Sequence, residues 1–143
     1  MTFSIGQSIK AGLSSLAESS GLLRRLHRGR VLILLYHRVL PEENLDASGA
    51  SAGTVVSQSA FARNLEFLRR DYEPLALPDW LERMQNGSLD AQRRYVIVTF
   101  DDGWADNYHH AWPVLKQYGM PATIFLSTGL VGTSRVFWWE AIE

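Results

Sequence analysis

The sequence Tyr95-Val96-Ile97-Val98-Thr99-Phe100-Asp101-Asp102-Gly103 decides how the rest of this chain is interpreted. Its first six residues form a short apolar and β-branched run, which predicts a strand buried on both faces. Two adjacent carboxylates and a glycine follow directly. Placing two like charges together at the end of an apolar strand costs free energy unless they share a cation or a proton. The stretch therefore predicts a strand that ends in a functional site.

A surface turn is the competing interpretation, because Asp and Gly are ordinary turn residues. A second apolar run, Val31–Tyr36, weakens it: this run is also predicted to be a buried strand, and His37 follows it. Functional residues of parallel α/β folds collect at the carboxyl ends of strands. We therefore predict that Asp101, Asp102 and His37 lie at the same edge of a sheet, although a lone histidine at a strand end is more often structural.

Composition restricts the class of protein. The chain has 143 residues, of which 46% are hydrophobic and 20% charged, with a formal net charge of -1, as expected for one soluble globular domain. Near-neutral charge gives no indication of nucleic-acid binding. The absence of cysteine excludes disulfides and thiolate metal sites. No apolar run is long enough for a membrane-spanning helix.

Residues 1–30 are predicted to be an N-terminal helical extension, because Ile5, Ile9, Leu13 and Leu16 recur at helical spacing. We expect this extension to pack on the domain. Contact with a membrane surface is the less favoured alternative, with arginines near the lipid headgroups. The extension lacks the pattern of a secretory signal peptide, which favours the cytoplasm or the cytoplasmic face of a membrane.

The remaining elements predict an α/β fold. The stretch 41–56 is predicted to be a loop. A helix begins at Ser57 or Ser59 with Phe61, Leu65 and Leu68 on its buried face. We further expect a short strand over 74–77, a short helix from Pro78 to about Gly87, two helical segments between Trp104 and Gly119 separated at Pro113, a buried strand over Ala122–Ser127, and the start of a helix over 136–143. Strand, helix and strand in this order predict a βαβ unit with parallel pairing.

The paired carboxylates favour metal-assisted hydrolysis. One aspartate can bind a divalent cation while the other removes a proton from the attacking water. An aspartyl phosphotransferase with magnesium is an alternative of another class, but it generally needs its two aspartates separated by one residue.

The residues also carry a resemblance. Thr99–Gly103, Asn107-Tyr108, Pro113–Leu115 and Tyr118–Phe125 resemble the polysaccharide deacetylase family with its NodB-homology domain. Leu35–Val39 is similar to the first strand of many members, and Phe137–Trp139 is similar to an aromatic segment that some carry. The likeness covers about residues 31–140.

The resemblance implies a distorted (β/α) barrel that uses zinc or a similar divalent metal to hydrolyse acetyl groups, mostly on N-acetylated polysaccharides or oligosaccharides. It makes Asp101 the general base and Asp102 a metal ligand, with His37 lining the site. Residues 31–143 would form a partial NodB-like domain after the 1–30 extension.

One departure from the family pattern matters. The family completes its metal site with two histidines three residues apart, whereas the histidines of this chain are His27, His37, His109 and His110. We interpret His109 and His110 as exposed or structural. The expectation is therefore the N-terminal part of a truncated barrel with an incomplete zinc site and little or no activity alone. A non-catalytic carbohydrate-binding or interaction module with a degenerate site is the alternative.

Overall fold

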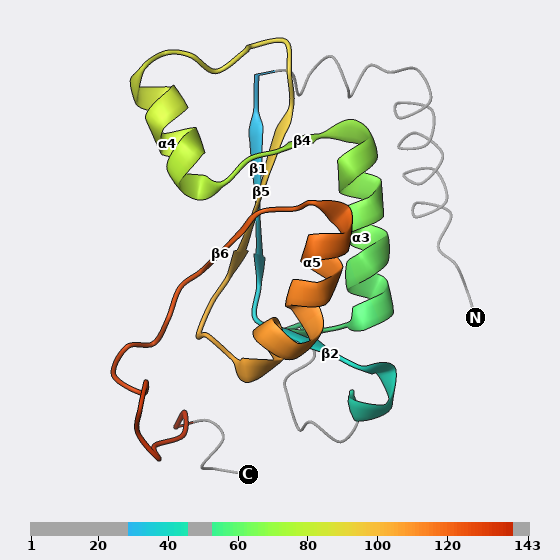
Figure 1. Cartoon of the computed structure of the whole chain (residues 1–143), viewed down its shortest axis with the longest axis vertical. Helices are drawn as coiled ribbons and strands as arrows, with labels where there is room; N and C mark the ends of the chain where they lie inside the picture. Colours follow the sequence, from blue (N-terminus) through green and yellow to red (C-terminus); the bar gives the residue numbers. More distant parts are fainter. Residues whose placement is uncertain (1–28, 46–52, 139–143) are drawn as a thin grey trace, which may run out of the picture.

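The fold is built around β5 (Tyr95–Phe100), the strand that precedes the paired aspartates (Figure 1). The structure, a computed structural model, describes residues 29–45 and 53–138. Along one side, β5 pairs in parallel with the whole of β1 (Val31–Tyr36). Along the other side, β4 (Glu73–Pro74) pairs with its beginning and β6 (Ala122–Ile124) with its end, both in parallel. All six residues of β5 are buried, as the sequence predicts for a central strand.

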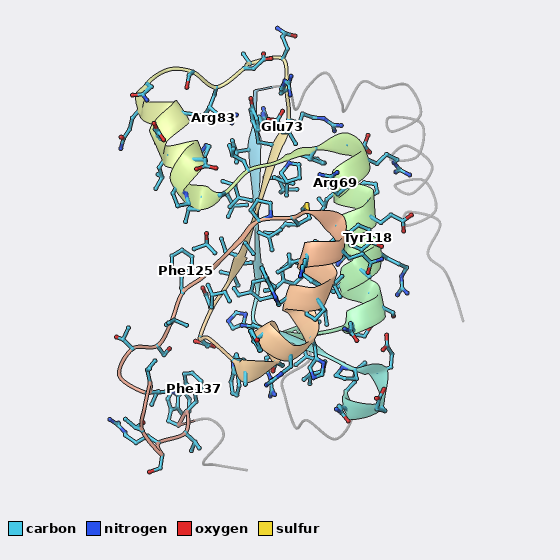
Figure 2. The ribbon with its side chains drawn as sticks, in the orientation of Figure 1. Arg69, Glu73, Arg83, Tyr118, Phe125 and Phe137 are labelled. Atoms are coloured by element: carbon cyan, nitrogen blue, oxygen red, sulfur yellow. The ribbon has the colours of Figure 1, made fainter. Side chains whose placement is uncertain are left out.

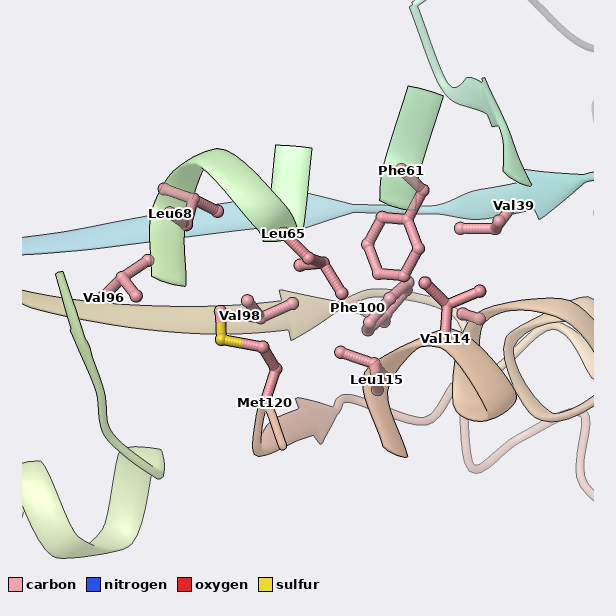
Figure 3. Close-up of a cluster of buried hydrophobic side chains, with 11 residues drawn as sticks. Val39, Phe61, Leu65, Leu68, Val96, Val98, Phe100, Val114, Leu115 and Met120 are labelled. Carbon is pink, nitrogen blue, oxygen red and sulfur yellow. The ribbon is translucent and has the colours of Figure 1, made fainter. Parts of the chain in front are cut away.

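One face of the sheet is covered by α3 (Gln58–Asp71) and α5 (Trp112–Tyr118) (Figure 1). Alternate residues of β5 point toward these helices and form the larger core (Figure 3), whose labelled members are Val39, Phe61, Leu65, Leu68, Val96, Val98, Phe100, Val114, Leu115 and Met120. Phe61 contacts the rings of Tyr36 and Phe100 with centroid separations of 5.0 and 5.9 Å. This core attaches both helices to the central strand.

The opposite face is only partly covered. Tyr95 and Ile97 pack there with Leu75 and with residues that include Leu77 and Trp80 of α4 (Leu77–Gln85). Ile33 and Leu35 of β1 pair with Ile97 and Thr99 and share this face, but they are 48% and 55% exposed. The predicted burial of Val31–Tyr36 is therefore wrong. Among the residues that the structure describes, β1 has a partner strand only on the β5 side.

The start of α3 and the end of α5 lie where the sequence predicts. The Ser57 hydroxyl caps α3 by accepting a hydrogen bond from the Ala60 N–H at 3.1 Å. Gly119 ends α5 in the left-handed conformation, with φ of 59°. The strand–helix–strand unit β5–α5–β6 is parallel, as predicted. However, β6 ends at Ile124, which is 44% exposed, so a buried strand over Ala122–Ser127 is wrong in both length and burial.

A small second sheet was not predicted. β2 (Arg38–Leu40) pairs in parallel with β3 (Val55–Ser57), and a 3-10 turn over Glu42–Asn44 lies between them in the sequence. These two strands lie within and beside the predicted loop. The second sheet matters for function because β2 begins one residue after His37.

Other expectations have mixed outcomes. The short helix is confirmed as α4, whereas the strand expected over 74–77 lies at Glu73–Pro74. Residues 136–138 are not helical, and 139–143 lie outside the described residues. Nearly all of the predicted N-terminal extension, residues 1–28, also lies outside them. Within the described parts of the chain, no helix is long and apolar enough to cross a membrane.

Candidate active site

The turn after β5 has an unusual backbone. Asp102 and Gly103 have φ angles of 72° and 74°, and Asp102 is the only non-glycine residue with positive φ among residues 29–45 and 53–138. Aspartate tolerates this conformation better than most residues, but it remains less favourable than an extended backbone. Sequence reasoning assigned the sharp turn to Gly103 alone. The structure places the left-handed backbone at both residues, which ends the strand alternation after Asp101.

Sheet register brings His37 beside Asp101. The N–H of Asp101, one residue beyond the end of β5, donates to the carbonyl oxygen of Tyr36, the last residue of β1, at 3.0 Å. Alternation along the two strands places His37 and Asp101 on the face of the sheet opposite α3 and α5. Asp101, Asp102 and His37 are all half-buried. The predicted meeting of these residues at one sheet edge is therefore observed in the backbone.

Three polar residues that sequence reasoning missed lie next to this edge. The Asp106 carboxylate accepts hydrogen bonds from Arg38 Nε at 2.8 Å and from the Val39 N–H at 3.2 Å. The Asn107 side chain satisfies its hydrogen bonds when its amide nitrogen donates to the His37 carbonyl oxygen at 2.9 Å and to Asp106 Oδ1 at 3.2 Å. The network links the end of β1 to the turn after β5.

A π-helical turn places Asn107 in this network. Residues Asn107–Ala111 form the π-helix, which runs directly into α5, so the two helical segments expected around Pro113 are continuous. Proline lacks an N–H, and a wider turn before it accommodates its ring. Gln58 Nε2 donates to the His110 carbonyl at 3.1 Å, satisfying a backbone acceptor in this irregular segment.

Aromatic contacts connect the same network to a later part of the chain. The Arg38 guanidinium lies over the Trp104 ring, 4.2 Å from its centroid. The Trp104 ring also contacts Phe137, with a centroid separation of 5.0 Å. Figure 2 shows Phe137 on the segment that follows β6, at the end of the molecule away from Glu73 and Arg83. The segment after β6 is therefore anchored near the paired aspartates.

The residues present do not form a closed metal site. Across the described ranges there is no group of three or more His, Asp or Glu side chains that could hold a metal ion. Catalytic zinc sites generally use three protein ligands. His109 is exposed and contacts the Tyr108 ring, which agrees with the interpretation of this histidine as exposed or structural. The described residues therefore do not complete such a site.

A second polar region lies far from the aspartates, at the amino ends of the strands. It is an open depression whose walls are largely charged, and its lining residues include Arg70, Asp71, Glu73, Arg93 and Arg94. These charges pair with one another: Glu73 binds both Arg93 and Arg83, and Arg94 contacts Asp71 at 3.4 Å. Because opposite charges compensate there, we assign this region a structural role.

Comparison with known proteins agrees with the geometry. Residues 88–143 match the family model described as polysaccharide deacetylase. Over 109 residues the chain is 35% identical to a poly-beta-1,6-N-acetyl-D-glucosamine N-deacetylase of Staphylococcus aureus, covering 71% of this chain and 37% of that protein. Over 115 residues it is 30% identical to a Bacillus subtilis (strain 168) protein named as a candidate polysaccharide deacetylase, covering 80% of this chain and 38% of that protein.

Solved structures show the same relationship. The protein IcaB from Ammonifex degensii is 33% identical with a TM-score of 0.59, over 73% of this chain and 41% of that one. The Streptococcus pyogenes deacetylase PplD, solved with acetate, is 26% identical with a TM-score of 0.61, over 80% and 51% of the two chains. The chain therefore resembles the polysaccharide deacetylase family, and its α/β fold corresponds to part of a NodB-type barrel. It spans only 37–38% of the curated relatives described above.

Proposed function

We propose that this chain carries the acid–base part of a polysaccharide deacetylase site and acts in the removal of acetyl groups from an N-acetylated polysaccharide. One observation carries the proposal: two aspartates follow the fully buried central strand and turn through a left-handed backbone beside His37. A strained turn at the carboxyl end of a buried parallel strand is typical of functional sites. The relatives named as deacetylases support the same reaction class.

The two aspartates have different proposed roles. Asp101 would be the general base that removes a proton from the water attacking the acetamide carbonyl. Asp102, whose backbone is left-handed, would be the residue that binds the divalent metal, for which the resemblance implies zinc. His37 would line the same edge. A bound divalent cation supplies Lewis-acid activation in such hydrolases. The described residues do not complete its ligand set, so the metal remains part of the proposal.

Acetate release tests the proposal. The 143-residue chain is expected to release little or no acetate from oligomers of β-1,6-linked N-acetylglucosamine, with or without zinc. A hybrid in which this chain replaces the matching segment of the Staphylococcus aureus N-deacetylase is expected to be active. In that hybrid, Asp101→Asn should abolish turnover and leave metal binding intact, whereas Asp102→Asn should weaken metal binding.

The hybrid needs its own controls. Circular dichroism would show that each hybrid is folded, and isothermal titration with zinc would give the affinity. Equal loss of zinc from Asp101→Asn and Asp102→Asn would show that the assigned roles are wrong. A folded hybrid that binds zinc without releasing acetate would reject the deacetylase proposal for this segment.

A non-catalytic carbohydrate-binding module is the second candidate function. The observation that favours it is that no complete set of metal ligands occurs in the described parts of the chain. Binding of N-acetylated oligosaccharides by the 143-residue chain that is unchanged by a chelator, together with an inactive folded hybrid, would favour this alternative.

A further inference from the structure

Two polar side chains beside the candidate site are almost completely buried, although the proposed chemistry does not use them. Asp106 is 7% exposed and Asn107 is 3% exposed. Their partner Arg38 is 19% exposed. Burying a carboxylate and an amide is unfavourable unless each is hydrogen-bonded, and here each one is. Burying such a network costs free energy unless every member is hydrogen-bonded, and the hydrogen bonds then fix its members in one arrangement.

The network binds the main chain on both sides of Arg38. Asn107 donates to the carbonyl oxygen of His37, and Asp106 accepts from the N–H of Val39. These groups flank Arg38, whose guanidinium binds the same carboxylate at 2.8 Å. Three hydrogen bonds therefore hold the segment from His37 to Val39. All three contacts end on Asp106 or Asn107, which lie shortly after the Asp101–Asp102 turn in the sequence.

We propose that Arg38, Asp106 and Asn107 are positioning residues, which fix His37 relative to Asp101 and Asp102. They act on the main chain around His37 through the hydrogen bonds to the His37 carbonyl and from the Val39 N–H. The Arg38–Asp106 pair joins positions 68 residues apart, so no local interaction could hold these two segments in the same way. A role in catalysis rests on the proposed function. The effect of the network on the backbone near His37 can be measured without any enzyme activity.

A purely structural role makes a different prediction. If the network only stabilised the fold, weakening it would raise hydrogen exchange at all slowly exchanging amides by a similar factor. A positioning role predicts a local effect. The hydrogen bond between the Asp101 N–H and the Tyr36 carbonyl lies next to the held segment, so this amide should respond more than amides in the middle of β5.

The test uses the 143-residue chain labelled with ¹⁵N and studied by NMR. Asn107→Leu removes the donor and keeps the number and branching of the side-chain non-hydrogen atoms. It is expected to speed exchange of the Asp101 amide at least tenfold more than that of Val98, and to shift the His37 and Asp101 amide resonances. Arg38→Lys keeps the positive charge and should retain most of the wild-type shifts, whereas Arg38→Met should reproduce the change seen with Asn107→Leu.

Asn64→Leu is the matched control, because Asn64 is an exposed residue of α3 and donates to the Tyr36 hydroxyl at 3.4 Å. It should leave the Asp101 and His37 resonances unchanged. Asn107→Ala removes the donor without adding a charge and replaces Asn107→Leu if that variant does not fold. Equal acceleration at Asp101 and Val98, or equal effects of Asn64→Leu and Asn107→Leu, would overturn the proposal. A local response combined with an inactive hybrid enzyme would reject the deacetylase function and keep the positioning role.

Discussion

The Asp101 N–H donates to the Tyr36 carbonyl oxygen at 3.0 Å, so the residue that follows β5 is bound to the last residue of β1. This bond sets His37 beside Asp101 through the register of the sheet. Loop conformation alone does not determine their proximity. A candidate site anchored in this way moves only if the central sheet moves, which suits groups that must keep a fixed separation.

The left-handed backbone of Asp102 makes a prediction about stability. Its φ of 72° is unfavourable for residues with a Cβ atom. Asp102→Ala should lower the free energy of unfolding by about 1 kcal/mol, because alanine cannot form the local hydrogen bonds by which aspartate tolerates this conformation. Asp102→Gly should have little effect. Urea unfolding checks both variants, and equal stabilities of the Ala and Gly variants would contradict a strained backbone at this position.

Gly103 allows a comparison with a second glycine. An alanine Cβ at Gly103 would meet the end of the Leu126 side chain, whereas one at Gly119 would meet no atom nearby, and both glycines have positive φ. Leu126 is 56% exposed and can rotate away. Gly103→Ala and Gly119→Ala should therefore each cost about 1–2 kcal/mol from backbone strain. Thermal unfolding tests this, and Gly103→Ala/Leu126→Ala should match Gly103→Ala. Recovery of stability in that double variant would show that Leu126 is held in place.

Tyr36 gives a prediction for alkaline pH. Burial raises the pKa of its hydroxyl, and the hydrogen bond from Asn64 opposes part of that rise. The unfolded chain then ionises first, at a pKa of about 10. The stability linked to Tyr36 is therefore fully present below about pH 10 and is lost as pH rises through the higher folded pKa.

Tyr36→Phe should consequently flatten the decline of unfolding free energy as pH rises above about 10. Tyr108→Phe is the control, since the Tyr108 side chain is 70% exposed. Chemical unfolding at a series of pH values measures both slopes. An unchanged slope in Tyr36→Phe would show that this hydroxyl does not titrate differently in the folded chain.

The exposed face of β1 makes a prediction about self-association. Leu35 is 55% exposed on a strand with no described partner on its outer side, a combination that promotes pairing between chains. Leu35→Lys should reduce association at high concentration while changing stability by less than about 1 kcal/mol. Phe67→Lys, at a residue 53% exposed on α3, is the control. Sedimentation velocity compares them, and an equal reduction in both variants would point to general charge repulsion.

Much of the framework was predictable because it depends on local patterns. β5 follows from its continuous apolar run, and α3 follows from its serine cap and the spacing of Phe61, Leu65 and Leu68. The same local pattern misled for β1. An apolar run indicates that a strand can be buried. Whether Leu35 is in fact buried depends on residues far away in the sequence that pack against it.

The site was predictable only in part. Asp101, Asp102 and His37 each follow a strand that can be recognised from the sequence. Arg38 and Asn107 lie in segments that carry the family resemblance and Asp106 does not, but nothing in the sequence indicates that the three form one network, since it arises from contacts between distant segments. Pro113 within a helical pattern was the one available signal of an irregular turn, and it indicated a break where the structure has a π-helix.

The order of the strands along the chain has a consequence for synthesis. β1 is made well before β5, and the Thr99 hydroxyl binds the Leu34 carbonyl across 65 residues of sequence. At a translation rate of about 5–20 residues per second, several seconds pass between the synthesis of the apolar segment Val31–Tyr36 and that of its partner strand. We therefore expect the yield of folded protein to depend on translation speed and on chaperones that shield this segment during that interval.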